Sequence, residues 1–161
     1  MRNLPPLVKG FDGPTVEWQR LEDVNFEFLG YLLSCHLVIE HYLDEVIMTL
    51  GTSLNWESAK LTFSQKLALF PQELLPGNFN PIPAIKHLNS IRNKIALNIR
   101  SRPEDLNLLP IKDYLSANYR DAMDVPSGAI ELLEEFTSIV CSCFAGWIAS
   151  DAHRTTWRNK K

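Results

Sequence analysis

Cysteine is scarce in this chain of 161 residues, and no apolar run of the kind that directs secretion stands at its start. There are three cysteines, an odd number. The first fourteen residues contain three prolines and two glycines in place of an apolar run. These features predict a cytoplasmic protein with reduced thiols. Cys141 and Cys143 are two positions apart on a predicted helix, so they point in different directions and form no helical chelate. We expect small core residues there, not metal ligands or redox groups.

A basic excess is also missing. The chain has 16 Lys and Arg against 19 Asp and Glu, which gives a formal net charge of −3. Dedicated nucleic-acid binders usually carry a positive balance, so any binding of RNA has to depend on a local patch. No uncharged stretch reaches the length of about 20 residues that a membrane helix needs. The uncharged stretch 136–149 predicts a buried core or interface helix and no membrane contact.

The common motifs of catalysis and cofactor binding are absent from the sequence. It has no glycine-rich phosphate loop, no G-x-S-x-G elbow, no Cys-x-x-Cys pair and no His-Glu-x-x-His. A conventional hydrolase, a nucleotide-dependent enzyme, a bound metal and a small-molecule cofactor are therefore unsupported.

The remaining pattern is helical. Apolar residues recur at helical spacing over four segments, 21–50, 56–70, 83–101 and 128–152, with Asn55 as the expected cap of the second. Residues 104–126 suggest short helical turns, and no stretch alternates with period two as a strand does. We predict an all-α fold, an antiparallel bundle of four main helices with a short-helix insertion. Residues 1–20 are expected to be irregular, 21–152 to form one domain, and 153–161 to be a basic tail.

One segment resembles a known family. Residues 60–102 contain KLTFSQKLALF, then a proline-rich link, then AIKHLNSIRNKIALNIRSR. A helix, a loop and a helix with these strings resemble the HEPN superfamily of small helical proteins, whose members typically read R-N-x-x-A-H at this point. Arg92, Asn93 and Ala96 match that motif, whereas Leu97 occupies the position of its histidine.

The resemblance implies a function and a change in it. In active members two motifs meet across a homodimer, where Arg and His act on the phosphodiester of RNA. Imidazole can move a proton at neutral pH, and leucine cannot. The resemblance therefore implies a HEPN-like homodimer through the motif-bearing helices that has lost metal-independent cleavage. It would be a binding module for RNA or a protein partner, in a stress, toxin–antitoxin or defence system.

The motif helix also carries the residues expected to bind RNA or a partner: Arg92, Asn93, Lys94 and Arg100. No acidic residue lies between Lys86 and Arg102. The alternative is an ordinary exposed helix whose charges spread over more than one face.

Two residues of the first helix are candidates for a dimer interface near the motif, His36 and Glu40, one turn apart. The alternative for His36 is a hydrogen-bonded core residue. Two other functions remain open. One is a weakly active ribonuclease that uses Arg92 with a substitute His36, His41 or His87. The other is a transcription regulator resembling the mannitol repressor group, with a protein or sugar-operon partner.

Overall fold

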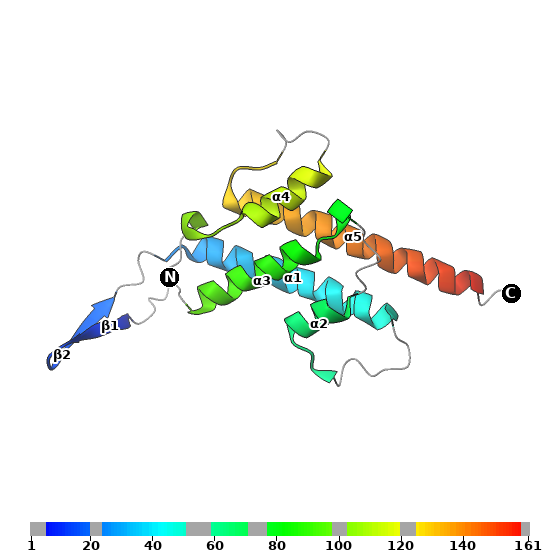
Figure 1. Ribbon diagram of the computed structural model, residues 1–161. Helices are drawn as coiled ribbons and strands as arrows, with labels where there is room; N and C mark the ends of the chain where they lie inside the picture. Colours follow the sequence, from blue (N-terminus) through cyan, green and yellow to red (C-terminus); the bar gives the residue numbers. More distant parts are fainter. Residues whose placement is uncertain are drawn as a thin grey trace.

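The computed structural model describes residues 6–19, 24–50, 59–70, 77–97, 103–119 and 125–158. Within these ranges the chain is mostly helical, with five α-helices, two short 3-10 turns and one two-stranded sheet (Figure 1). The elements are β1 (Leu7–Asp12), β2 (Thr15–Gln19), α1 (Phe26–Leu50), α2 (Phe63–Leu69), η3 (Gly77–Phe79), α3 (Ile82–Leu97), η4 (Pro103–Asp105), α4 (Leu109–Asn118) and α5 (Ala129–Arg158).

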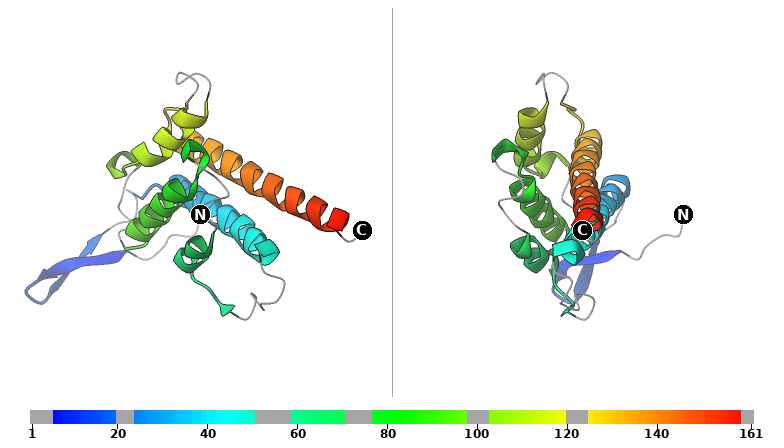
Figure 2. Two further views of the ribbon diagram at one scale, coloured as in Figure 1. Left: turned by 45° about the vertical axis from the view of Figure 1, so that its right-hand side comes forward. Right: turned by 90° about the vertical axis from the view of Figure 1, so that its right-hand side faces the viewer.

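Helices α1 and α5 form the centre of the molecule. The apolar stripe of α1 buries Leu32, Ile39 and Leu43, and α5 buries Phe136 and Phe144 at the matching helical spacing. The two helices run in the same direction along each other (Figures 1 and 2). The prediction of an antiparallel bundle is therefore wrong for this pair. A parallel pair needs a long connection, which α2, α3 and α4 supply.

Helix α3 crosses α1 (Figure 1). Its start is as predicted, because the Asn80 side chain accepts a hydrogen bond of 3.0 Å from the backbone N–H of Ile82, and Pro83 occupies the first turn. The predicted stripe is confirmed at four positions, all buried: Ile85, Leu88, Ile91 and Ile95. Ile99 lies outside the described residues.

Helix α2 is shorter than the predicted segment 56–70. A capping box starts it, in which the Thr62 side chain accepts from the Gln65 backbone and the Gln65 side chain accepts from the Thr62 backbone. Just before this box Lys60 has a φ of +45°, whereas a right-handed α-helix needs a negative φ at every residue. The helix therefore does not extend back through Lys60. Asn55, the expected cap, lies outside the described residues. The helix ends at Leu69 because Phe70, before Pro71, takes an extended conformation.

The N-terminal segment is not irregular as predicted. It forms a β-hairpin, the arm, whose antiparallel strands β1 and β2 extend away from the helices (Figures 1 and 2). Gly13 turns the chain with a φ of +57°, and Pro14 follows with its fixed negative φ. Glycine at the first central position is what a type II′ hairpin turn requires.

Helix α5 continues through Arg158, so the predicted boundary at Ala152 is also wrong. By length and composition alone, its stretch Ala129–Ser150 could span a bilayer, with a mean hydropathy of 1.4. A core helix passes the same test, and Leu133, Phe136 and Val140 of this stretch are fully buried in the core that α5 shares with α1.

Candidate functional site

The outward face of α3 carries two of the four predicted binding residues, Asn93 and Lys94. With Ile85, Leu88, Ile91 and Ile95 turned into the core, the opposite side presents five exposed residues: Lys86, Ser90, Asn93, Lys94 and Leu97. Their spacing of three, four and one places them on one side of the helix. Lys86, Asn93 and Lys94 therefore lie on one side of the helix. We call these five residues the α3 face.

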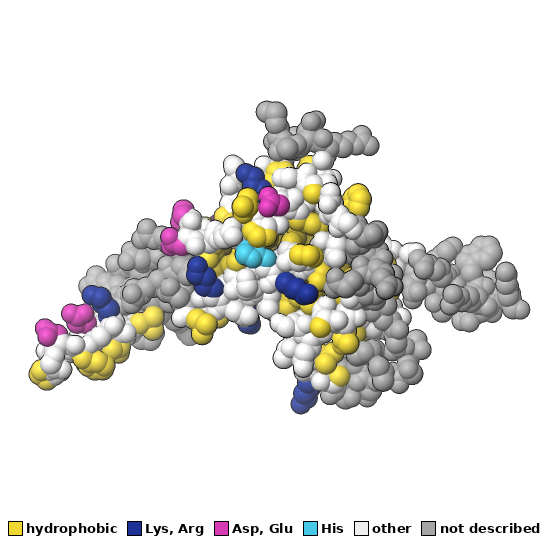
Figure 3. Space-filling view, in the orientation of Figure 1, with side chains coloured by type: hydrophobic (Ala, Val, Ile, Leu, Met, Phe, Trp, Pro, Cys, Tyr) yellow, Lys and Arg dark blue, Asp and Glu magenta, His cyan; other side chains and the backbone are white. Residues whose placement is uncertain are grey.

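The α3 face is locally positive. Helix α3 has no Asp or Glu between Ile82 and Leu97. The space-filling view, in which α3 lies toward the viewer, shows dark-blue cations over this helix, and the magenta carboxylates lie elsewhere (Figure 3). On a chain with a net charge of −3, this is the kind of local patch that binding of a polyanion needs. Arg100, the fourth predicted residue, lies outside the described residues.

Arg92 points to the other side of α3. Its Nη1 donates a hydrogen bond of 3.0 Å to Oδ1 of Asn93, and its Nε is buried with no acceptor among the described residues. Five residues on a helix correspond to a rotation of about 140°. Arg92 and Leu97 therefore point in different directions, and the side chain of Leu97 is 90% exposed. A histidine at position 97 would not meet Arg92 of its own chain.

Beneath the α3 face lies a polar cluster built on His36, which is only 4% exposed. The Nε2–H of His36 donates to Oδ1 of Asn89 over 3.1 Å, and Nδ1 is 4.0 Å from a carboxylate oxygen of Glu40. The Asn89 amide donates in turn to Ser64, and the ring of Phe63 lies 4.2 Å from the imidazole, centre to centre. The cluster thus ties α1, α2 and α3 together at their crossing.

Burial lowers the pKa of His36 below its usual value. The hydrogen bond to Asn89 and the charge of Glu40 act in the opposite direction, and the charges of Arg92 and Lys66 add to the lowering. At neutral pH this imidazole is therefore neutral, and its burial keeps it from any substrate in solvent.

The lowered pKa predicts an acid-sensitive fold. The unfolded chain binds a proton at His36 near pH 6.5, and the folded chain resists it, so the free energy of unfolding falls as the pH drops below about 6.5. The contribution of His36 to the slope of the unfolding free energy against pH approaches but does not exceed about 1.4 kcal/mol per pH unit. Urea unfolding between neutral and mildly acidic pH measures it. His36→Gln should flatten the slope, whereas His41→Gln, at an exposed position of the same helix, should not; equal slopes in all three proteins would contradict the assignment.

Glu40 also forms its ion pair within its own chain. Lys66 of α2 donates hydrogen bonds of 2.8 Å to both Glu40 and Asp44 of α1. Burial alone would lower the pKa of Lys66, but these bonds and the two negative charges outweigh it and raise that pKa. Within the chain, the two predicted dimer-interface residues differ in burial: His36 is buried, and the Glu40 side chain is 26% exposed and joins α1 to α2 through Lys66.

The other nucleophiles and bases of the described residues offer no catalytic pair with Arg92. His87 donates its Nε2–H to the backbone carbonyl of Asn107 over 2.6 Å, in the link before α4. Burial raises the pKa of the Cys141 thiol to about 11, so it is protonated at neutral pH. Over the part of the chain that the structure describes, no three His, Cys, Asp or Glu side chains gather in a way that holds a metal ion.

Known proteins add nothing to this geometry: no family model matches the chain, and no curated protein or solved structure is significantly similar to it.

Proposed function

We propose that the chain is a non-catalytic, HEPN-like helical domain that binds single-stranded RNA through the α3 face, as a homodimer in the cytoplasm. The observation that carries the proposal is the arrangement of α3: Lys86, Asn93 and Lys94 face outward together, without a carboxylate on the helix. Lysines neutralise the phosphates of an RNA strand, and an amide can donate to phosphate or base.

Loss of catalysis is supported by the positions of the histidines. His36 is buried and hydrogen bonded to Asn89, and His87 is bound to a backbone carbonyl. His41 is five residues from His36 on α1, so it points about 140° away from the ring that neighbours Arg92. Leu97 stands on the α3 face where a catalytic imidazole would be, and it can neither donate nor accept a proton.

Binding to a short, labelled single-stranded RNA tests the proposal. Fluorescence anisotropy should show binding at about 50 mM salt that weakens steeply by about 200 mM, because each phosphate contact contributes roughly 0.7 to the logarithmic salt slope. The affinity for duplex DNA of the same length is measured for comparison. A single RNA strand and a B-form DNA duplex present their phosphates in different arrangements. Absence of binding at the lower salt would contradict the RNA part and leave a protein as the partner of the α3 face.

A further inference from the structure

The outward face of α1 is apolar although it borders solvent. Five exposed positions recur at helical spacing and form one stripe along the helix: Phe26, Gly30, Leu33, Leu37 and Met48. Leu37, near the centre of the stripe, is 63% exposed. In the right-hand view of Figure 2, the blue start of α1 lies at the edge of the helical body, on the side away from α3. We call these five residues the α1 face.

Charged residues are missing where a surface helix normally carries them. The side of a surface helix opposite to its buried stripe is usually charged or polar. From Phe28 to Ile39, however, α1 has no Asp, Glu, Lys or Arg. The exposed Ser34 hydroxyl donates a hydrogen bond of 2.8 Å to the backbone carbonyl of Gly30, so its polar group already has a partner. A helix that is apolar on both sides suits packing on both sides.

Gly30 is a residue that the fold of its own chain does not require. It lies in the interior of α1, where glycine is less favourable than alanine. A Cβ atom at this position would meet nothing within 4 Å, so the chain has room for alanine. Glycine on an exposed helix lets another molecule approach the backbone closely. Gly30 therefore points to a partner that packs on the α1 face.

The charges around the α1 face are negative. Helix α1 contains no Lys or Arg, and neither does Ala129–Ser150 of the neighbouring α5. Glu27 and Glu45 are about five turns apart on one edge of the face, and neither pairs with a cation among the described residues. Burial raises the pKa of Tyr31, and the charge of Glu134 on α5 raises it further, which places this third carboxylate beside α1.

These charges decide which occupant fits the α1 face. RNA brings phosphates, which the carboxylates repel. A second copy of the chain would bring the same carboxylates, Glu27 and Glu45, to the interface, and like charges in contact disfavour an interface. The complement of this face is an apolar stripe with basic flanks. The face is straight and roughly 33 Å long from Phe26 to Met48, a shape against which a second helix packs ridges into grooves.

We propose that the α1 face binds an amphipathic helix of another protein. The apolar stripe of that helix packs over Gly30 and Leu37, and Lys or Arg on its flanks pair with Glu27 and Glu45. The site lies on the side of the helical body away from α3, so it leaves the α3 face open to RNA (Figure 2).

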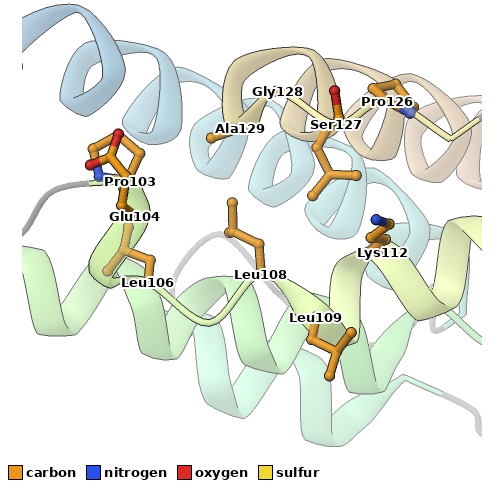
Figure 4. A pocket seen from close by; sticks show the side chains of 11 residues that line it. Pro103, Glu104, Leu106, Leu108, Leu109, Lys112, Pro126, Ser127, Gly128 and Ala129 are labelled. Carbon is orange, nitrogen blue, oxygen red and sulfur yellow. The ribbon is translucent and has the colours of Figure 1, made fainter.

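A hollow between η4, α4 and the start of α5 is a second apolar surface and provides the matched control. It has a volume of about 470 Å³, and Figure 4 shows Leu109 on its α4 side and Ala129 on its α5 side. Its charged residues are one cation and one anion, Lys112 and Glu104, so it does not select a basic ligand. Leu109 is 58% exposed, which is close to the exposure of Leu37.

Binding of a labelled model peptide to the full chain, without RNA, tests the proposal. The probe is a synthetic amphipathic helix of about five turns with leucines on one side and lysines elsewhere. A comparison peptide has glutamates in place of the lysines. Fluorescence anisotropy at about 150 mM salt should show at least about tenfold tighter binding of the lysine peptide. Equal affinities, or no binding of the lysine peptide, would overturn the proposal.

A pair of leucine variants locates the peptide. Leu37→Ala should weaken binding of the lysine peptide at least about fivefold, because it removes an apolar contact at the centre of the face. Leu109→Ala should leave the affinity unchanged. Circular dichroism checks that both variants remain helical. An equal loss in both variants, or no loss in Leu37→Ala, would exclude the α1 face as the site.

A pair of charge variants separates the flanks of the α1 face from the net charge. Glu27→Gln/Glu45→Gln should weaken binding of the lysine peptide at least about fivefold. Glu104→Gln/Asp113→Asn removes two exposed negative charges of η4 and α4, away from the face, and should have little effect. Equal losses in the two double variants would show that the peptide responds to net charge, which contradicts the proposal.

Gly30→Ala gives the sharpest readout, because it moves stability and binding in opposite directions. Alanine is the better helix former, so Tm should rise by about 1–4 °C. The added methyl group fills the space that the partner helix needs, so the affinity for the lysine peptide should fall at least about fivefold. Loss of binding in a more stable protein cannot come from misfolding. An unchanged affinity would overturn the role of Gly30.

Sedimentation of the wild type and of Leu37→Asp tests a second copy as the occupant. If the wild type is a dimer and Leu37→Asp is a monomer, a second copy covers the α1 face and the proposal is wrong. A dimer that persists in Leu37→Asp leaves the face open, as the proposal requires. None of these outcomes bears on the binding of RNA to the α3 face.

Discussion

The double variant Lys86→Glu/Lys94→Glu should bind single-stranded RNA at least tenfold more weakly than the wild type at about 50 mM salt. Both lysines lie on the α3 face, and α3 has no carboxylate between Ile82 and Leu97 that already neutralises them. Replacing them removes two phosphate contacts and adds two repulsive charges. The logarithmic salt slope should also fall, by roughly 1.4 for two contacts.

Lys60→Glu is the matched control for this variant. Lys60 is exposed, but it precedes α2 and does not belong to the α3 face. Lys60→Glu changes the net charge by the same amount per substituted residue, so its RNA affinity reports the effect of overall charge alone. Equal losses of affinity per substitution in Lys60→Glu and in the double variant would show that RNA responds to net charge alone, and the α3 face would lose its role.

Phe136→Ala should have the largest effect on stability. Phe136 is fully buried on α5, and its ring meets the ring of Tyr114 on α4 edge to face, with 5.7 Å between centres. Truncating a buried phenylalanine costs about 3–5 kcal/mol, and the lost aromatic contact accounts for about 0.5–1.5 kcal/mol of interaction. Domains of this size have a total stability of about 5–15 kcal/mol, so the variant should be marginally folded. Urea unfolding at neutral pH measures the loss.

Phe79→Ala provides the comparison, because Phe79 in η3 is 63% exposed. Its removal should change the free energy of unfolding by no more than about 0.5 kcal/mol. A loss of less than about 1 kcal/mol for Phe136→Ala would contradict the packing of α5 against α4 and α1.

The long helices could be predicted from the sequence because each has to bury a stripe. Leu88, Ile91 and Ile95 recur at helical spacing, and only a helix turns all three into the core. The direction of α5 relative to α1 was not predictable in this way, since the period of a stripe is the same for parallel and antiparallel pairs. The start of α2 has a local signal that the prediction of Asn55 as the cap did not use, because Thr62 and Gln65 form a capping-box signature.

The arm was missed for a specific reason. A bulge between Val8 and Gly10 places an extra residue in β1, so Val8 and Phe11 share a face although they are three positions apart. A search for strict period-two alternation fails there. The usable signal was Gly13 between two short β-branched and aromatic stretches, which is typical of a two-residue hairpin turn.

At the candidate site, sequence spacing predicted the outward residues better than the inward ones. Lys86, Asn93 and Lys94 are exposed because the core stripe of α3 fixes which side faces solvent. The partners of His36 depend on the crossing of α1, α2 and α3, so the contacts with Asn89 and the pairing of Glu40 with Lys66 have no local signature. The position of His36 on an apolar stripe did indicate a buried histidine, which the structure confirms.

The most direct test of the central claim is incubation of purified wild-type protein and Arg92→Ala with labelled single-stranded RNA and a metal chelator, with the length of the RNA measured over time. We predict that the wild type binds the RNA and leaves it intact at every protein concentration, because Leu97 stands in the place of the motif's histidine and His36 is buried and hydrogen bonded to Asn89. Cleavage by the wild type that Arg92→Ala abolishes would contradict the account, and would show that the chain is a ribonuclease with a substitute base.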